Sequence, residues 1–166
     1  MRLSVKKLIN APGERVDFRF DADLSHVDFG GACPARQPVS VVGQVENIAG
    51  MLLLTMQVQT VLDTACDRCG KPLKKPVDFS VQYMLAEELQ EQENDDILLL
   101  EGDEVDLDEL VRVEFILHMD SKTICSENCK GLCPRCGADL NLGPCSCKKE
   151  TDPRLAVLAK LLDKND

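Results

Sequence analysis

The chain has 166 residues, nine cysteines and a formal net charge of −10, with five phenylalanines, one tyrosine and no tryptophan. This length can bury a hydrophobic core without the cross-links that the smallest secreted domains need. The first ten residues contain no apolar run typical of a secretory signal, and no stretch approaches the roughly 18 apolar residues of a membrane-spanning helix. We therefore expect a cytoplasmic protein without a membrane partner, whose reduced thiols are better explained by metal binding than by disulfides.

The negative charge is concentrated in one segment. Residues 85–114 contain thirteen acidic side chains and one basic side chain, Arg112, whereas residues 1–84 are nearly neutral and residues 121–166 are mildly basic. The acidic run EELQEQENDD at 87–96 is polar without periodicity, which indicates a solvated loop. The same run could also imitate a nucleic-acid backbone toward a basic partner.

The first part of the chain has the signals of β-strands. RLSVKKLI at 2–9 is compatible with a strand or a short helix, and VDFRF at 16–20 predicts a strand. Residues 39–85 predict an antiparallel meander with a turn at 47–50. Its clearest strand has the period of two that one buried face produces, and the apolar residues of that face are Leu52, Leu54, Met56, Val58 and Leu62.

Two helices are expected after the meander. ILLL at 97–100 reads as a short buried strand or the lead-in to a helix. Asp106 then stands at an N-cap position with Glu109 three residues later, which is the spacing of a capping box. DPRLAVLAKLLDKND at 152–166 predicts a short amphipathic helix that packs on its own domain or in a partner's groove.

The predicted fold class is α+β. An antiparallel β-meander core with a capped helix is followed by a cysteine-rich zinc-knuckle segment and the short amphipathic helix. We expect a β-rich α+β domain at 1–120, which includes a first cysteine knuckle at 66–69 and the acidic segment at 85–114, and a zinc-binding segment with the C-terminal helix at 121–166.

The strongest chemical signal is a repeated motif. CDRCGKPL at 66–73 and CPRCGADL at 133–140 share the pattern C-x-R-C-G-x-x-L. Two thiolates at this spacing can bind one ion from a tight turn, and the following glycine, Gly70 or Gly137, permits a positive φ there. Paired knuckles of this kind favour zinc over an iron–sulfur cluster.

Eight of the nine cysteines are candidate metal ligands, and they allow two groupings. In the favoured one, the spacing C-x2-C-x8-C-x-C closes a local site at 133–147, and the first knuckle takes its other two ligands from 125–129. In the alternative, the two knuckles share one ion. A closed four-sulfur site leaves no open position, so two structural zinc ions are expected. The ligands are Cys66, Cys69, Cys125, Cys129, Cys133, Cys136, Cys145 and Cys147.

The remaining candidates are weaker. Cys33 reads as a plain free thiol, His118 as a possible spare ligand or base, and His26 has no partner nearby in sequence. The chain has no phosphate loop, nucleophile elbow or H-E-x-x-H motif, so no catalytic residue and no small-molecule substrate are expected. RNA or partner contacts are predicted only for basic residues around the cysteines: Arg68, Lys71, Lys130, Arg135, Lys148, Lys149 and Arg154.

The motifs together resemble one protein family. CDRCG, the capped helix VDLDELVRVEFIL, the block CKGLCPRCGADLN and the segment DPRLAVLAKLL are similar to the bacterial and plastid YceD family over about residues 50–165. The resemblance implies a non-enzymatic ribosome biogenesis factor that supports 23S rRNA processing and accumulation and large-subunit assembly. The implied partner is a pre-large-subunit particle, 23S rRNA or its precursor, or a basic ribosomal protein.

Two enzymatic interpretations remain open at this level. A thiol-disulfide oxidoreductase could use a C-x2-C motif, although the βαβ pattern that usually accompanies such a motif is missing. A nuclease acting on precursor rRNA would suit the implied role, but no constellation of metal-binding carboxylates stands out in the sequence.

Overall fold

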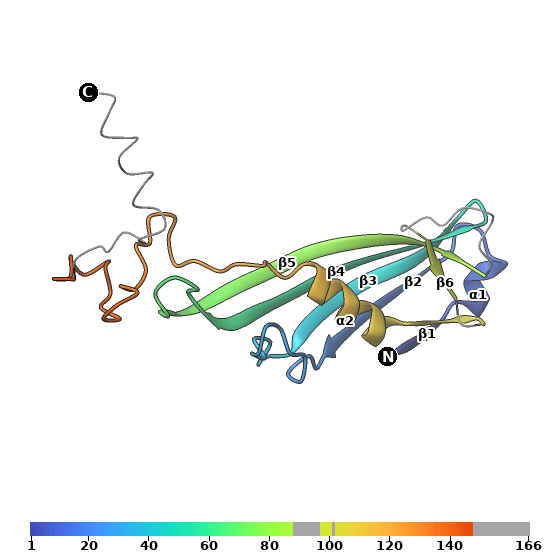
Figure 1. Ribbon diagram of the computed structural model, residues 1–166. Helices are drawn as coiled ribbons and strands as arrows, with labels where there is room; N and C mark the ends of the chain where they lie inside the picture. Colours follow the sequence, from blue (N-terminus) through green and yellow to red (C-terminus); the bar gives the residue numbers. More distant parts are fainter. Residues whose placement is uncertain (88–96, 101, 148–166) are drawn as a thin grey trace, which may run out of the picture.

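The computed structural model describes residues 1–87, 97–100 and 102–147. A five-stranded sheet with the strand order β2-β3-β4-β5-β6 dominates the fold (Figure 1). A second, two-stranded sheet pairs β1 with β7, and two helices, α1 and α2, complete the described structure. The elements are β1 (Arg2–Ser4), α1 (Lys6–Ile9), β2 (Arg15–Ala22), β3 (Val39–Ile48), β4 (Met51–Ala65), β5 (Pro72–Ala86), β6 (Ile97–Leu99), β7 (Glu104–Asp106) and α2 (Leu107–Leu117).

Strands β2 to β5 form the antiparallel meander that the sequence predicts. The long β4–β5 hairpin is in register from Leu52 opposite Leu85 to Ala65 opposite Pro72. The turn between β3 and β4 is at Ala49 and Gly50, both with positive φ. The β4–β5 hairpin is much longer than the other strand pairs. Its turn at 66–71 therefore projects beyond the ends of β2 and β3 (Figure 1).

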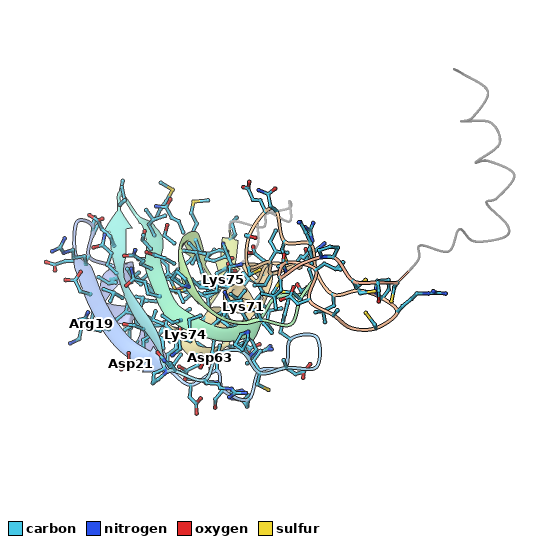
Figure 2. All side chains as sticks on the ribbon, turned by 90° about the vertical axis from the view of Figure 1, so that its left-hand side faces the viewer. Arg19, Asp21, Asp63, Lys71, Lys74 and Lys75 are labelled. Atoms are coloured by element: carbon cyan, nitrogen blue, oxygen red, sulfur yellow. The ribbon has the colours of Figure 1, made fainter. Side chains whose placement is uncertain are left out.

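The core lies on one face of this sheet. The inward residues of β4 are almost fully buried, with exposed fractions of 0–6% from Leu52 to Leu62, as their alternation predicts. The helix α2 covers this face, and the buried carboxylate of Glu114 accepts a hydrogen bond from the hydroxyl group of Tyr83 on β5. The opposite face is polar and open, and Figure 2 shows charged side chains such as Arg19 and Asp21 along its β2 edge.

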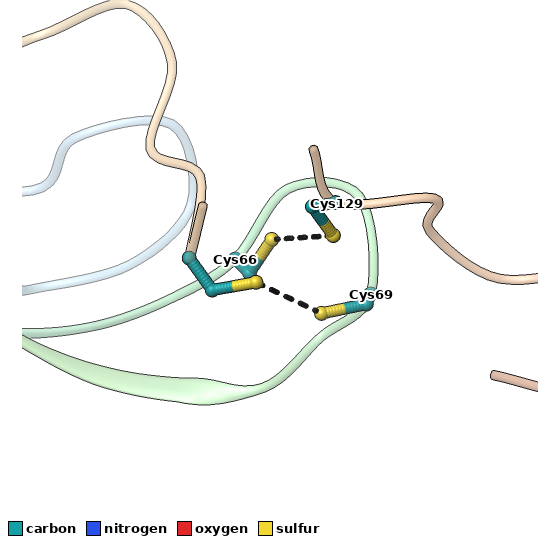
Figure 3. Close-up of side chains that lie close together, drawn as sticks. Cys66, Cys69 and Cys129 are labelled. Carbon is teal, nitrogen blue, oxygen red and sulfur yellow. Dashed lines mark hydrogen bonds between the residues drawn. The ribbon is translucent and has the colours of Figure 1, made fainter. Parts of the chain in front are cut away.

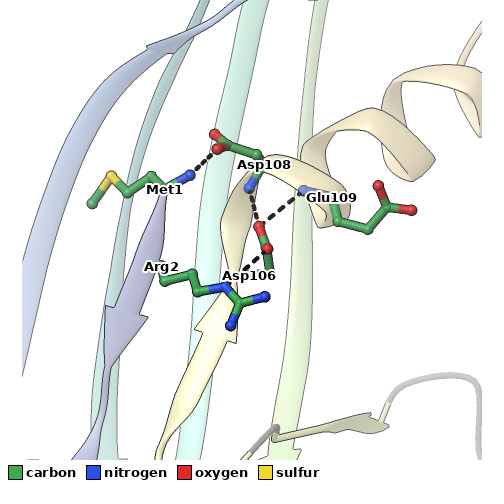
Figure 4. Close-up of polar contacts among 5 residues, drawn as sticks. All are labelled: Met1, Arg2, Asp106, Asp108 and Glu109. Atoms are coloured by element: carbon green, nitrogen blue, oxygen red, sulfur yellow. Dashed lines mark hydrogen bonds and ion pairs between the residues drawn. The ribbon is translucent and has the colours of Figure 1, made fainter.

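Asp106 caps α2 as predicted. Its side chain accepts hydrogen bonds from the backbone N–H groups of Asp108, at 3.1 Å, and Glu109, at 3.3 Å (Figure 4). The reciprocal half of a capping box is not used here, because the Glu109 carboxylate instead accepts two hydrogen bonds from the guanidinium group of Arg112. The cap also ties the helix to β1, since Arg2 forms an ion pair with Asp106.

The α+β class is confirmed in its coarse form, and the fold is mostly β with few helices. The first segment forms both of the structures considered for it, β1 followed by α1. Residues 97–99 form β6, and β6 pairs with β5 in parallel, so the sheet is mixed at this edge rather than wholly antiparallel. The acidic run beyond residue 87 and the predicted C-terminal helix lie outside the described residues. Among those that are described, no helix combines the length and apolar content needed to cross a membrane.

One close contact inside the sheet restricts which residue can occupy position 43. Gly43 of β3 lies opposite Phe18 of β2, and the Phe18 ring fills the space that a side chain at position 43 would take. A Cβ atom added at Gly43 would lie 2.5 Å from the ring and 2.5 Å from the backbone oxygen of Thr55. The ring can turn aside, but the strand backbone cannot. The Phe18 ring therefore covers Gly43, and the close approach of the β4 backbone requires glycine at this position.

We expect the substitution Gly43→Ala to lower the free energy of unfolding by about 1–3 kcal/mol, because the methyl group must displace packed atoms of the next strand. Urea unfolding of the zinc-loaded protein measures this change, with Gln44→Ala on the open face as the matched control. Adding Phe18→Leu should recover only part of the loss. Equal stability of Gly43→Ala and the control would show that the contact is not restrictive.

Candidate metal centres

Four cysteines converge at the turn of the β4–β5 hairpin. Cys66 and Cys69 lie in the turn itself, and Cys125 and Cys129 come from the chain that follows α2. The Cys66 and Cys129 sulfurs are 3.8 Å apart, and the Cys69 and Cys125 sulfurs are 3.7 Å apart (Figure 3). All four sulfur atoms lie within 4.8 Å of one another. We call this set site 1.

The sulfur spacing fits one tetrahedral ion. A zinc–sulfur bond of about 2.3 Å places two sulfurs of a tetrahedral site about 3.8 Å apart. A disulfide would bring two sulfurs to about 2.05 Å, which is far shorter than either distance in site 1. The geometry therefore matches four thiolates around a single ion, and zinc or iron are the ions that four sulfurs in a tetrahedron select.

The second group, site 2, is local in the sequence. Cys133, Cys136, Cys145 and Cys147 also have their sulfurs within 4.8 Å of one another. The eight cysteines are thus grouped as in the favoured prediction, and the alternative in which the two knuckles share one ion is wrong. Site 1 draws two ligands from each side of the boundary expected at residue 120.

The two knuckles have the same backbone structure. In the first, the Cys66 N–H donates to the Lys71 carbonyl at 2.9 Å, and the Gly70 N–H donates to the Cys66 carbonyl at 2.8 Å. In the second, the corresponding bonds run from Cys133 to Ala138 at 2.8 Å and from Gly137 to Cys133 at 2.9 Å. Both glycines have a φ of 70°. The sequence repeat is therefore a structural repeat, and each glycine provides the left-handed residue that the turn requires.

The chain after α2 is held against the first knuckle by polar contacts. The Asp67 N–H donates to the Thr123 carbonyl at 2.8 Å, and the Thr123 N–H donates to the Asp67 carboxylate at 2.6 Å. The Arg68 guanidinium donates to the Cys129 carbonyl at 2.9 Å. These contacts place Cys125 and Cys129 opposite the knuckle. Arg68, which the sequence suggested as an RNA contact, here positions Cys129, a candidate metal ligand.

Site 2 is built directly onto site 1. The Leu132 N–H donates to the Arg68 carbonyl at 3.0 Å, so the chain that enters the second knuckle is hydrogen-bonded to the first knuckle. Gly131 has a φ of 73°, and a Cβ atom there would lie 2.9 Å from the Arg68 carbonyl oxygen. A glycine is needed at this position for both reasons.

Backbone N–H groups favour ionisation of one thiol in each site. Burial disfavours the Cys66 thiolate, but backbone N–H groups, chiefly that of Cys125, donate to its sulfur and lower its pKa to about 6. The backbone N–H groups of Cys136 and Arg135 likewise lower the pKa of Cys133 to about 6. Both thiols are therefore largely thiolates at neutral pH, which is the form that binds a metal ion.

Crowding of the sulfurs has the opposite effect on other members of the sites. A backbone N–H group of Lys71 favours the Cys69 thiolate, but burial and the neighbouring sulfurs raise the pKa of Cys69 to about 12. The sulfur of Cys136, together with burial, raises the pKa of Cys147 to about 12. Four thiolates at this spacing repel one another, so full ionisation of either site requires a cation.

Asn141 is a residue of the site that the sequence reasoning did not identify. Its side-chain amide donates to the Cys129 sulfur at 3.5 Å and to Asp139 at 2.7 Å, and its side-chain oxygen accepts from the Lys130 N–H at 2.8 Å. A residue of the second knuckle thereby supports a ligand of site 1. No spacing rule connects position 141 to position 129, since the contact depends on how the two knuckles dock.

The other predicted site residues have varied surroundings. Lys71, Lys130 and Arg135 are exposed around the two sites, and Figure 2 shows Lys71 at the end of the hairpin. Cys33 is an exposed free thiol far from both sites in the sequence. His118 stacks on Phe79 with ring centroids 4.1 Å apart and is not part of either cysteine set. The remaining predicted contacts, Lys148, Lys149 and Arg154, lie outside the described residues.

Comparison with known proteins gives a consistent result. The profile of the family described as large ribosomal RNA subunit accumulation protein YceD matches residues 54–162, which is more than half of the chain and includes both sites. A maize protein, "large ribosomal RNA subunit accumulation protein YCED homolog 1, chloroplastic", is 30% identical over 164 residues, covering 80% of this chain. No solved structure matches the chain.

The relatives differ in length. The chain spans 56% of the maize protein and 46% of the Arabidopsis thaliana protein of the same name, which is 27% identical over 147 residues and covers 70% of this chain. It spans 99% of the protein YlbN of Bacillus subtilis, which is 25% identical over 170 residues and covers 100% of this chain. The chain thus has about half the length of the plant relatives and the full length of a bacterial one.

The grouping of the cysteines predicts how metal is lost on substitution. Cys66→Ser should remove one of two bound zinc ions, and Cys145→Ser should remove the other, because each change breaks a different four-sulfur set. Elemental analysis of the purified variants gives the metal content per chain, with Cys33→Ser as the control that retains both ions. Loss of both ions from either variant would contradict two separate sites, as would zinc-free wild-type protein.

We further expect Asn141→Leu to weaken zinc binding at site 1 about tenfold, because the substitution removes a hydrogen bond to a ligand sulfur while keeping a similar volume. Competition with a chelator measures the affinity, and Cys145→Ser provides a background in which only site 1 is occupied. Asn128→Leu, at an exposed position between the ligands of site 1, is the matched control. Unchanged affinity would show that the contact to the Cys129 sulfur does not support the metal.

Proposed function

The chain belongs to the YceD family, and from this membership and the two four-sulfur sites we propose that it is a ribosome biogenesis factor that acts without catalysis. It supports the processing and accumulation of 23S rRNA and the assembly of the large subunit. The observation that carries the proposal is the family match at 54–162, which includes every candidate ligand from Cys66 to Cys147. The name of the maize relative refers to accumulation of large-subunit ribosomal RNA.

The site geometry supports a structural role for the metal. Four sulfurs occupy all the positions of a tetrahedral ion, so a substrate would find no open coordination position. Sulfur distances of 3.7 and 3.8 Å are those of ligands around an ion rather than of a dithiol that has closed to a disulfide. Two zinc ions would thus hold the chain beyond α2 in a fixed shape at the end of the hairpin.

Basic side chains are exposed around the cysteine sites at the end of the hairpin. Lys71 and Lys130 are exposed next to site 1, and Lys122 is exposed just before Cys125. We propose that these side chains, with Arg135, contact the phosphate groups of rRNA in a pre-large-subunit particle. The lysines bind as point charges on flexible stems, so they would add affinity without reading the base sequence.

The acidic segment would complement this basic end. The sheet runs from the cysteine sites at one end to β6 and the β3–β4 turn at the other, where Glu87 is exposed (Figure 1). Acidic side chains repel phosphate, so they would limit non-specific RNA binding or would hold a basic ribosomal protein. Work on ribosomal subunits would place the protein in the cytoplasm, and this location follows from the proposal.

We expect the protein to co-sediment with pre-large-subunit particles in a sucrose gradient and to cross-link to 23S rRNA or its precursor. The double substitution Lys71→Glu and Lys130→Glu should reduce this association by at least tenfold, because it reverses two charges that face the phosphates. Lys7→Glu, also exposed but on α1 at the other end of the sheet, is the control.

Two results would overturn the proposal. The protein would remain at the top of the gradient even after cross-linking in cells, or it would contain no metal and cycle reversibly between dithiol and disulfide forms. The second result would favour a thiol-disulfide oxidoreductase. Hydrolysis of precursor rRNA by the purified, zinc-loaded protein would instead favour a nuclease.

A further inference from the structure

The open edge of the sheet at β2 has an unusual charge pattern. Within the described structure, β2 pairs on one side only, with β3. Its residues on the open face alternate in sign: Arg15, Asp17, Arg19 and Asp21, and all four are exposed. Every second residue of an edge strand also directs its N–H and C=O groups away from the sheet. The edge therefore offers both backbone hydrogen-bonding groups and an ordered row of charges.

The pattern is complementary to itself when it is reversed. If two β2 strands lie antiparallel with Phe18 opposite Phe18 of a second copy, Arg15 faces Asp21 and Asp17 faces Arg19. A two-residue shift instead places Asp17 opposite Asp17 and Arg15 opposite Arg19. Opposite charges across a strand pair are stabilising and like charges are destabilising, so the charges select the register centred on Phe18.

The apolar face of β2 agrees with this register. Val16, Phe18, Phe20 and Ala22 lie on the core side, where Phe18 is 6% exposed and Phe20 is only partly buried. In the register centred on Phe18, Phe20 lies beside Val16 of the second copy, so the exposed rim of the core would be covered. A one-residue slip would place these side chains on the polar face and is therefore disfavoured.

We propose that the open edge of β2 pairs with β2 of a second copy of this chain, which joins two sheets into one continuous sheet. This inference goes beyond the proposed function and does not depend on it. Pairing of one eight-residue strand buries less area than a standard protein interface, so the dimer is weak and forms in a concentration-dependent way. Because the strands are antiparallel, the cysteine sites of the two copies lie at opposite ends of the joined sheet.

Charge reversal at positions 17 and 19 tests the register. The two residues face Gln44 and Val42 of β3, which are uncharged, so their substitution breaks no charge pair with the neighbouring strand, and the pair that Asp17→Arg removes is the 3.8 Å contact with Arg15 of the same strand. Asp17→Arg alone places like charges opposite each other twice in the dimer, and should raise the dissociation constant at least tenfold. The double variant, Asp17→Arg with Arg19→Asp, restores opposite charges and should restore dimerisation. Ser80→Arg, exposed on the same face of β5, is the control and should dimerise as wild type does.

Sedimentation of the full-length, zinc-loaded protein over a range of concentrations measures the dissociation constants. Hydrogen exchange should slow with concentration at backbone amides of β2 and not at β6, the other edge of the sheet. Alternating charges also occur simply to keep a sheet edge soluble. A protein that stays monomeric at about millimolar concentration would establish that role and overturn the proposal. Dimerisation unaffected by Asp17→Arg, or not restored in the double variant, would likewise overturn it.

Discussion

Mutual repulsion among the sulfurs of site 1 is the constraint on which the C-terminal part of the described structure depends. Cys66 and Cys69 are fixed by the long hairpin, whereas Cys125 and Cys129 arrive on a chain without regular secondary structure. Four thiolates within 4.8 Å are compatible only if a cation balances them. Binding energy of the ion is then folding energy for the segment that supplies half of the ligands. The polar contacts of Asp67 with Thr123 guide this segment to its place but do not remove the repulsion.

The orientation of site 2 depends on its contacts with site 1. Its ligands are close in the sequence, yet its orientation is set by Leu132, which donates to the Arg68 carbonyl, and by Asn141, which donates to the Cys129 sulfur. With both ions bound, residues 121–147 would therefore form a single rigid extension of the sheet, in which the two sites have fixed positions relative to each other. If the basic side chains bind RNA as proposed, a rigid extension would hold them at defined positions, and a preorganised surface loses little conformational entropy on binding.

The sheet itself has two different surfaces and two different ends. One face is covered by α2 and forms the core, and the other is polar, with Gln57 and Gln59 both donating to Asp78 across β4 and β5. The basic residues around the cysteines lie at one end, and the β2 edge runs along the side. A dimer through β2 would place the two basic ends far apart, so that one assembly could contact two separate RNA segments, and such bivalence would raise the overall affinity without any new contact.

Local patterns determined what could be read from the sequence alone. The period-two alternation of β4, the Asp106 cap and the two glycine-containing knuckles were all predicted, because each depends on residues within one strand, turn or helix start. The sequence also reduced the cysteines to two groupings and favoured the one with a local site at 133–147, but it left the alternative open. Tertiary structure decided between them: Arg68 and Asp67 hold residues 123–129 against the first knuckle, so the sulfurs of Cys125 and Cys129, and not those of the second knuckle, lie within 4.8 Å of the Cys66 and Cys69 sulfurs. Contacts between positions more than 50 residues apart decided it, and spacing along a chain carries no information about such contacts.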